Sequence, residues 1–300
     1  MDSFLRVIGF SKIRTGNRYS DIQNDVIHNP DKRIIFSGDD GTVVVEYHKM
    51  YGDNLGIVLR GLIDERENII VQSCEAFAGS DTDAYVNKYI VEYSNDEPVI
   101  VFEDIDTGNE LVFELLNRVD LLKGEKHFID YGRSVHFSKA LGIIRRKVNY
   151  SGLSLHGKVI LPVCKEAESY DEKLEEESFF NNLVLRFNEG DDDAGEMLKL
   201  YAEETTNVLR ERLMEEDFLS IVEGYFLPMD YNESEYSILG DITHVGYSVN
   251  SVTKERVVKL TVNTTGTDIQ IFINRKDLLG IPIKGMRFMG TCRLRGHVII

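Results

Sequence analysis

The segment from Gly152 to Val159 comes closer to a nucleotide-binding motif than any other part of this sequence. It reads Gly-Leu-Ser-Leu-His-Gly-Lys-Val. A phosphate-binding P-loop needs a serine or threonine after the lysine to hold Mg²⁺, and a helix whose first amides face the phosphate. Here a valine follows Lys158, and the apolar residues after it predict a strand. We therefore expect a loop that enters a strand, without a nucleotide.

A second short segment, residues 104–108, resembles the start of a calcium loop with the sequence Asp-Ile-Asp-Thr-Gly. A complete loop continues to a glutamate that binds the ion through both carboxylate oxygens. Leu111, Val112 and Phe113 occupy the following stretch and form a strand pattern instead. A hairpin turn is the expected structure.

Histidine and cysteine, the usual ligands of zinc, are scattered along the chain. No pair has HxH, HExxH or CxxC spacing, so we expect no metal and no cofactor. The nucleophile elbow, the kinase motifs and the dinucleotide fingerprint are also missing from the sequence. Distant side chains could still converge, which leaves open an enzyme with an active site between domains. The residues concerned are His28, His48, His127, His136, His156, His244, His297, Cys74, Cys164 and Cys292.

Basic side chains concentrate at the C-terminal end, although the chain of 300 residues carries a net charge of −17. Residues 236–300 hold 9 basic and 4 acidic side chains. OB folds hold single-stranded nucleic acid by stacking bases on exposed aromatics beside a cationic groove. Strand alternation instead points Phe272 and Phe288 inward, which favours a structural role for this region. The candidate contacts to nucleic acid or another partner are Arg256, Lys259, Arg275, Lys276, Lys284 and Arg287.

Acidic side chains concentrate in residues 165–223, which hold 19 acidic and 6 basic side chains. Apolar residues recur there at helical spacing, as in Phe180, Leu183, Val184 and Phe187, so two or three packed helices are expected. The acidic groups are interpreted as a solvated face and helix caps. A basic partner, or the basic C-terminal region of the same chain, could also bind them.

The remaining patterns predict elements that would position any site. Residues 17–27 have the spacing of a helix that ends at Asn29-Pro30, and residues 4–10 fit a short helix or a strand. Strand patterns joined by short turns then run through the first half of the chain. Alternation returns in the tail, where four or five strands are predicted in about 65 residues. No internal sequence repeat is visible.

These elements predict an α+β protein with three parts. Residues 1–164 form a mixed or antiparallel sheet domain with helices, because strands follow one another through short turns. Residues 165–232 form the acidic helical segment, and residues 233–300 form a small basic β-barrel-like domain of OB-like or SH3-like type. Composition shifts alone set these boundaries.

Composition narrows the class of protein. Apolar residues make up 42% of the chain, which excludes a wholly disordered protein and suffices for a packed core. No apolar run reaches the ~18 residues that a membrane-spanning helix requires, so no membrane partner is expected. The N-terminus lacks the pattern of a signal peptide, and three scattered cysteines fit a reducing cytoplasm.

Two segments carry a resemblance to a known family: residues 4–12, Phe-Leu-Arg-Val-Ile-Gly-Phe-Ser-Lys, and residues 54–61, Asn-Leu-Gly-Ile-Val-Leu-Arg-Gly. Together with the order of the later segments of the chain, they resemble an uncharacterised bacterial family, a domain of unknown function seen among Clostridia and their Firmicute relatives. The resemblance implies a bacterial cytoplasmic protein and implies no functional residue.

These observations favour a non-enzymatic binding or regulatory protein with a protein partner. An enzyme with an interdomain active site is the alternative, and single-stranded nucleic-acid binding through the C-terminal region is a third, weaker hypothesis. The oligomeric state and the ligand do not follow from the sequence.

Overall fold

The computed structural model describes residues 2–13, 16–38, 41–94, 97–104, 108–124, 146–162, 186–187, 194–195, 197–199, 224–229, 234–264 and 266–299. The chain divides into two compact units. One unit comprises Met1–Ile160 with Gly224–Ile300, and the other comprises Leu161–Glu223. The parts predicted as separate N-terminal and C-terminal domains therefore belong to one unit.

The second unit covers most of the predicted acidic helical segment, and most of that segment lies outside the described residues. The described residues of this unit beyond residue 162 are helical, as the apolar spacing predicts. Ala194 is buried there, and Phe187 is exposed. In the described part of the whole chain, no helix is long and apolar enough to span a bilayer.

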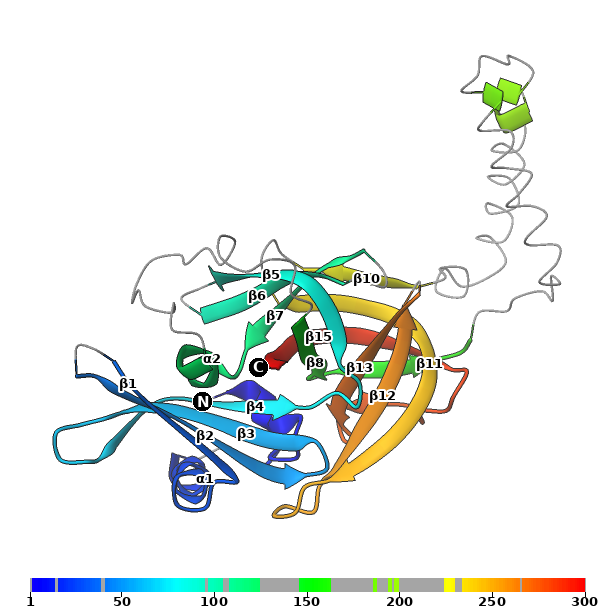
Figure 1. Cartoon of the computed structure of the whole chain (residues 1–300). Helices are drawn as coiled ribbons and strands as arrows, with labels where there is room; N and C mark the ends of the chain where they lie inside the picture. The colour runs from blue at the N-terminus through cyan, green and yellow to red at the C-terminus, as the bar shows by residue number, and fades with distance from the viewer. Residues whose placement is uncertain are drawn as a thin grey trace. The chain divides into compact units, whose positions relative to one another are not determined.

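A four-stranded antiparallel sheet follows the N-terminus. Helix α1 (Gly16–His28) precedes it, as predicted from residues 17–27. The strands lie in the order β1 (Lys32–Ser37), β2 (Val43–Gly52), β3 (Leu55–Ile63) and β4 (Ile69–Ala78). Neighbouring side chains of β2 face opposite sides of the sheet. Val45 shares a buried cluster with Val26 of α1, whereas Val44 shares one with Val119 of α2 (Arg118–Gly124), so the two helices cover opposite faces (Figure 1).

An eleven-stranded sheet holds the remaining strands of the described residues. Its order is β10-β11-β12-β13-β8-β5-β6-β7-β15-β9-β14, with additional pairing of β15 to β11 and to β8. The bounds of its strands are β5 (Ala84–Ser94), β6 (Glu97–Asp104), β7 (Glu110–Leu115), β8 (Arg146–Ser154), β9 (Gly157–Ile160), β10 (Tyr225–Pro228), β11 (Glu235–Val249), β12 (Arg256–Thr264), β13 (Thr267–Asn274), β14 (Leu278–Leu279) and β15 (Arg287–Ile299).

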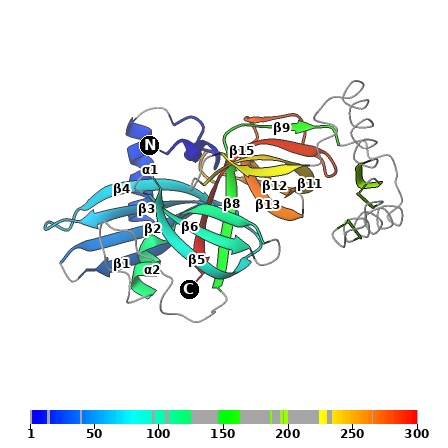
Figure 2. The same cartoon turned by 90° about the horizontal axis from the view of Figure 1, so that it is seen from above.

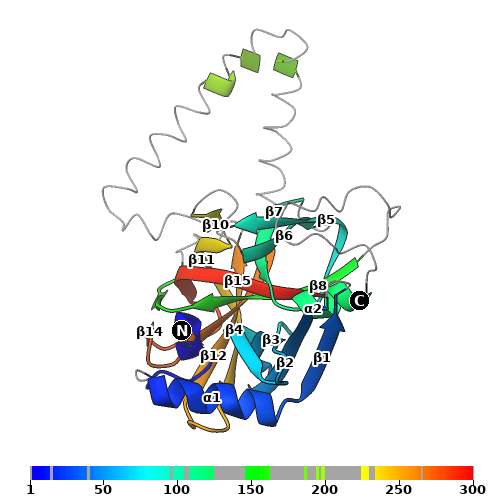
Figure 3. The same ribbon diagram turned by 90° about the vertical axis from the view of Figure 1, so that its left-hand side faces the viewer.

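The antiparallel pair β8–β15 belongs to two closed circuits of strand pairing (Figures 2 and 3). In the first circuit β5, β6 and β7 form a meander, β5 pairs antiparallel with β8, and β7 pairs parallel with β15. In the second circuit β11, β12 and β13 form a meander, β11 pairs antiparallel with β15, and β13 pairs parallel with β8. Exchanging β8 with β15 converts one pattern into the other. The fold therefore contains a structural repeat that the sequence does not reveal.

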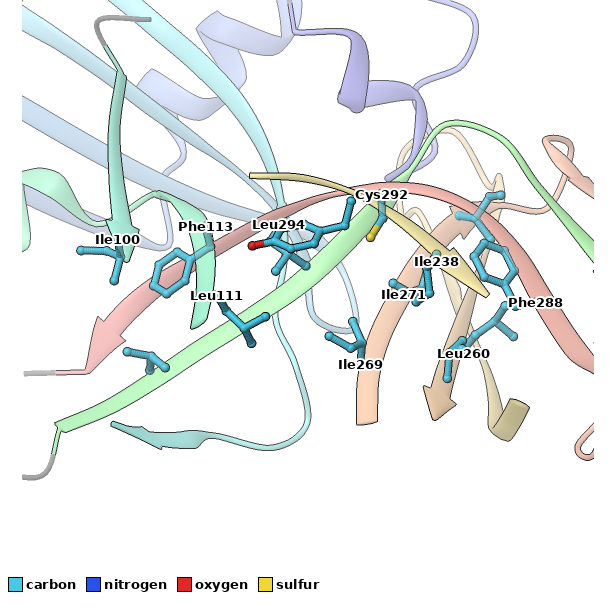
Figure 4. Packing of buried hydrophobic residues seen from close by; sticks show 14 of the residues in the cluster. Ile100, Leu111, Phe113, Ile238, Leu260, Ile269, Ile271, Phe288, Cys292 and Leu294 are labelled. Carbon is cyan, nitrogen blue, oxygen red and sulfur yellow. The ribbon is translucent and has the colours of Figure 1, made fainter. Parts of the chain in front are cut away.

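One buried apolar cluster extends along both circuits. Figure 4 shows Ile100 and Phe113 toward one end of the β8–β15 pair and Leu260 and Phe288 toward the other. Both circuits are therefore filled by side chains that alternate inward along their strands.

Four strands of the C-terminal region, β11, β12, β13 and β15, lie where alternation predicts them. Phe288 is buried in the cluster inside the circuits, as predicted. The prediction is wrong for Phe272, which is buried on the opposite face of β13, in the cluster shared with the N-terminal segment and the four-stranded sheet. These strands close a circuit only with β8, which comes from residues 146–154. Residues 233–300 are therefore not an independent unit. A period of two identifies a strand and its buried face, but it does not identify the partner strand.

Candidate anion-binding pocket

A cavity of about 650 Å³ lies where the N-terminal segment and α1 meet the ends of β12 and β13. Its walls come from residues 10–13, from α1 around Arg18 and Ile22, from the turn at residues 252–256 and from residues 274–276. We call it the cationic pocket. Its size falls in the range of ligand-binding cavities.

The N-terminal strap, residues 2–11, forms one side of the pocket. It begins with a short 3₁₀-helix at Ser3–Arg6, where the N-cap Asp2 accepts a hydrogen bond from the amide of Phe4. Arg6 donates through Nε and Nη2 to both carboxylate oxygens of Asp277, at 2.6 and 2.5 Å. This paired contact joins the first residues of the chain to the turn after β13.

Three side-chain amides and hydroxyls hold the backbone of the strap. Asn274 donates to the carbonyl of Arg6 at 3.0 Å, and Asn250 donates to the carbonyl of Ile8 at 2.8 Å. Thr253 donates to the carbonyl of Gly9 at 2.7 Å. The strap therefore uses side chains from the far end of the chain to satisfy carbonyls that are not paired within a sheet.

Gly9 has a φ of +97°, a conformation that L side chains rarely adopt. A Cβ atom there would also lie 2.7 Å from the Cβ atom of Asn250. The glycine in the Phe-Leu-Arg-Val-Ile-Gly-Phe segment is thus required by the turn of the strap and by its close approach to Asn250.

Glu255 lines the pocket and is 8% exposed. Its carboxylate accepts hydrogen bonds from Ser11 Oγ at 2.7 Å, Asn274 Nδ2 at 2.9 Å and Lys276 Nζ at 2.5 Å. Burial alone would raise the pKa of Glu255, but the hydrogen bonds from Lys276, Ser11 and Asn274 outweigh it and hold the pKa at about 2. Glu255 is therefore ionised at neutral pH and fixes the strap to the turn after β13.

Positive charge exceeds negative charge among the residues that line the pocket. Two carboxylates, Asp21 and Glu255, face six basic side chains, which leaves a balance of +4. The six basic residues are Lys12, Arg18, Lys254, Arg256, Arg275 and Lys276.

Most of these cations have no carboxylate partner among the described residues. Among the described residues, the side chains of Lys254 and Arg275 donate to the backbone carbonyls of Ser251 and Leu278 and to no carboxylate. Within the described ranges, Lys12, Arg18 and Arg256 form no ion pair with any side chain. The arrangement can therefore attract an anion without first breaking internal ion pairs.

The pocket contains half of the residues predicted as contacts. Arg256, Arg275 and Lys276 line it. Lys259 instead forms an ion pair with Asp81 at 2.7 Å, and Lys284 is exposed on the segment before β15, outside the pocket.

The prediction of a partner contact is wrong for Arg287. Its side chain is fully buried, with the Nε atom 3.5 Å from Asp241 Oδ1. Burial lowers the pKa of this guanidinium, against the opposing effect of Asp241. A side chain that solvent does not reach cannot contact a partner at the surface. Its neighbour Phe288 packs in the apolar cluster of the two circuits, so alternation along β15 places Arg287 on the opposite face, which is buried as well.

Lys12 and Arg18 were not predicted, because they lie more than 200 residues from the other pocket cations. One signal was available, since residues 1–20 hold four basic side chains and one acidic side chain. Local charge identifies such residues as basic, but only the contacts of the strap bring them to the C-terminal turns.

Comparison with known proteins identifies the family. A match to the family described as "Domain of unknown function, E. rectale Gene description (DUF3881)" covers residues 5–296. The chain belongs to this family. Searches of the curated proteins and of the solved structures gave no significant match.

The other segments considered as binding motifs form ordinary strands and connections in this DUF3881 family member. Residues 152–159 end β8 and begin β9, so they form the predicted loop into a strand. β6 and β7 pair antiparallel on either side of residues 105–109, which agrees with a hairpin there. Three or more His, Cys, Asp or Glu side chains do not converge into a metal site anywhere in the described ranges.

The described cysteines of this family member are buried thiols. Cys74 and Cys292 are free and 4% and 2% exposed. Burial raises the pKa of the Cys74 thiol to about 12, and burial also raises the pKa of the Cys292 thiol. Thiols in this state are poor nucleophiles at neutral pH, because the thiolate is the reactive form.

Proposed function

We propose that this protein is a non-enzymatic binding protein whose cationic pocket receives an acidic segment of a protein partner. The observation that carries the proposal is the +4 balance of the pocket in a chain with a net charge of −17. A local excess of cations in a recess concentrates the field and selects anionic groups.

The pocket offers little to a catalytic mechanism. A general acid or base works best with a pKa near the operating pH. Glu255 has a pKa of about 2, and its oxygens already accept hydrogen bonds from three residues. The described lining residues include no histidine or cysteine. A binding role therefore fits these side chains better than acid–base or nucleophilic catalysis.

A protein partner fits the pocket better than a nucleic acid. A bound single strand needs a track of cations and stacked aromatic side chains over several nucleotides. Phe272 and Phe288 are buried, and Lys259 and Arg295 form ion pairs with carboxylates of the same chain. Several unpaired cations gather in this one recess, which accommodates a few carboxylates.

Two further proposals concern the fold and the compartment. The closed pairing of β8 with β13 and β15, and of β11 with β12 and β15, supports an OB-like barrel that takes its fifth strand from residues 146–154. The free thiols of Cys74 and Cys292 support a reducing, cytoplasmic location.

The function is tested by fluorescence anisotropy with a fluorescein-labelled hexaglutamate peptide. We expect saturable binding that weakens steeply as salt rises from 50 to about 300 mM, because exposed charges are screened over about 10 Å at 0.1 M. The double variant Arg18→Ala, Arg256→Ala removes two unpaired cations and is expected to weaken binding by about tenfold.

Arg66→Ala provides the matched control. Arg66 is an exposed arginine in the β3–β4 turn and does not line the pocket. Equal loss of affinity in the control and the double variant would mean that net charge, not the pocket, attracts the peptide. Absence of binding at 50 mM salt, or tighter binding of labelled oligo-dT than of hexaglutamate, would contradict the proposal.

A further inference from the structure

Three aliphatic side chains are exposed at alternate positions of one short segment, which begins at the last residue of β14. Leu279, Ile281 and Ile283 are 71%, 68% and 57% exposed, whereas Pro282 between them is buried. Single exposed aliphatic residues are common, whereas several within one short segment are a candidate for an interaction surface. We call these three residues the aliphatic strip.

The aliphatic strip begins beside the cationic pocket. Leu279 lines a second cavity of about 550 Å³, together with Lys276, Asp277 and Met289. Lys276 also lines the cationic pocket. One lysine is therefore shared by the two cavities, and an extended ligand can pass from the cations to the aliphatic side chains over a short distance.

Several backbone contacts hold the strip in place. The amide of Gly285 donates to the carbonyl of Ile242 at 2.9 Å, and the amide of Met286 donates to the carbonyl of Ile283 at 3.1 Å. Leu278 and Leu279 pair with Gly157 and Lys158 of β9. A surface that is already ordered loses little conformational entropy when a partner binds, which favours affinity.

We propose that the partner of this protein is an extended polypeptide segment with acidic residues next to aliphatic ones. Its carboxylates occupy the cationic pocket and its aliphatic side chains cover the strip. This inference rests on the proposed function and specifies its partner. The acidic part of the ligand is assigned to the pocket because the lining of the pocket is cationic. The aliphatic part is assigned to the strip because Lys276 lines both the cationic pocket and the cavity that Leu279 lines.

A polypeptide is favoured over a lipid bilayer by the shape of the two surfaces. The cations line a recess of about 650 Å³, which a narrow chain can enter and the flat face of a bilayer cannot. The strip comprises three side chains in one segment, a width that suits one extended strand.

Three fluorescein-labelled peptides test the inference on the full-length protein by anisotropy. The acidic–aliphatic peptide has four glutamates, two glycines and Leu-Ile-Leu. The acidic peptide replaces the last three residues with serine, and the aliphatic peptide replaces the glutamates with glutamine. The acidic–aliphatic peptide, in the better of its two chain directions, is expected to bind at least about tenfold more tightly than the acidic peptide, the effect of burying one or two aliphatic side chains.

The double variant Leu279→Ser, Ile281→Ser is expected to abolish this gain and to leave binding of the acidic peptide unchanged. Ile70→Ser is the matched control, because Ile70 is 55% exposed on β4, in the other sheet. Unchanged melting temperatures of both variants would show that the fold is intact.

The outcomes separate this inference from the proposed function. Equal binding of the acidic–aliphatic and acidic peptides would overturn the inference and leave the proposed function standing. Tight binding of the aliphatic peptide alone would overturn the coupling of strip and pocket. Failure of every peptide would overturn both proposals. Strip-dependent sedimentation with phosphatidylcholine–phosphatidylserine vesicles, without peptide binding, would replace the polypeptide with a membrane surface.

Discussion

Two groups of charged residues in this protein are built from the same residue types and serve different ends. Around Arg295, positive and negative groups are matched and buried: Arg295 is 4% exposed and lies 2.6 Å from Asp2 and 2.7 Å from Glu114. In the cationic pocket, six basic residues face two carboxylates and most are open to solvent. Matched, buried charge holds the fold together, whereas unmatched, accessible charge is available to a ligand.

The buried group joins segments that are distant in the sequence. Arg295 of β15 also donates to the carbonyl of Ala76 on β4 at 3.0 Å, so it links both sheets and the strap. Burial alone would lower the pKa of Arg295, but Asp2 and Glu114 outweigh it and raise the pKa above its ordinary value. The charges of Arg295, Asp2 and Glu114 therefore stabilise one another, and removing one of these residues leaves a buried charge uncompensated.

The largest expected effect on stability follows from removing Arg295. Arg295→Ala leaves Asp2 and Glu114 without their main cation and is expected to lower the free energy of unfolding by about 3–5 kcal/mol. Arg293→Ala is the control on the same strand, since Arg293 is 33% exposed and its ion pairs are longer, at 3.3 and 3.6 Å. Its expected cost is about 0–1 kcal/mol. Equal losses in urea denaturation would remove the distinction between buried and exposed charge.

The next effect concerns pH. Burial alone would raise the pKa of Glu75, but Arg60, Arg118 and Arg295 outweigh it and lower the pKa from 4.5 to about 2. The unfolded chain therefore binds the proton more readily than the folded chain. Glu75 stabilises the fold fully above pH 4.5, by on the order of 3 kcal/mol, and this contribution is lost as the pH falls toward 2.

Unfolding measured between pH 7 and pH 3 tests this contribution. The difference between wild type and Glu75→Gln is expected to be largest at pH 7 and to shrink below pH 4.5. Glu65→Gln, an exposed change in the β3–β4 turn, is expected to leave stability unchanged throughout. A difference for Glu75→Gln that stays constant with pH would show that its ionisation is not coupled to folding.

A smaller effect is expected at the strap. Gly9→Ala forces a side chain into a φ of +97° and against Asn250, at a cost of about 1–3 kcal/mol. Gly41→Ala is the control for conformation alone, because Gly41 has a φ of +83° and open space around it. The melting temperature of Gly9→Ala is therefore expected to be lower than that of Gly41→Ala. The reverse order would mean that the contact with Asn250 is unimportant.

The smallest effect on stability is expected in the pocket. Arg256 is exposed and forms no ion pair among the described residues, so Arg256→Ala is expected to change the free energy of unfolding by less than about 0.5 kcal/mol. The same variant is expected to weaken hexaglutamate binding. A large loss of stability would assign Arg256 to the fold and not to a ligand.

The sequence predicted the local elements well. Helix α1, the hairpin of β1 and β2, and the C-terminal strands all follow from apolar spacing, because a strand or helix with one buried face must repeat at a period of two or near 3.6. The strand predicted after Lys158 is β9, and the strand predicted around residues 111–113 is β7. These features depend only on neighbours in the chain.

Tertiary structure alone decided which elements meet. The parallel pairing of β13 with β8 joins Ile271 to Gly152, and no local pattern in either strand specifies that partner. The six predicted contact residues separated in the same way, since Arg256 faces the pocket, Lys259 forms an ion pair with Asp81, and Arg287 is buried. Charge is a property of a residue, whereas exposure and partnership depend on contacts between distant segments. The sequence therefore determined the strands, and the fold determined what covers each face of a strand and which cations remained available to bind.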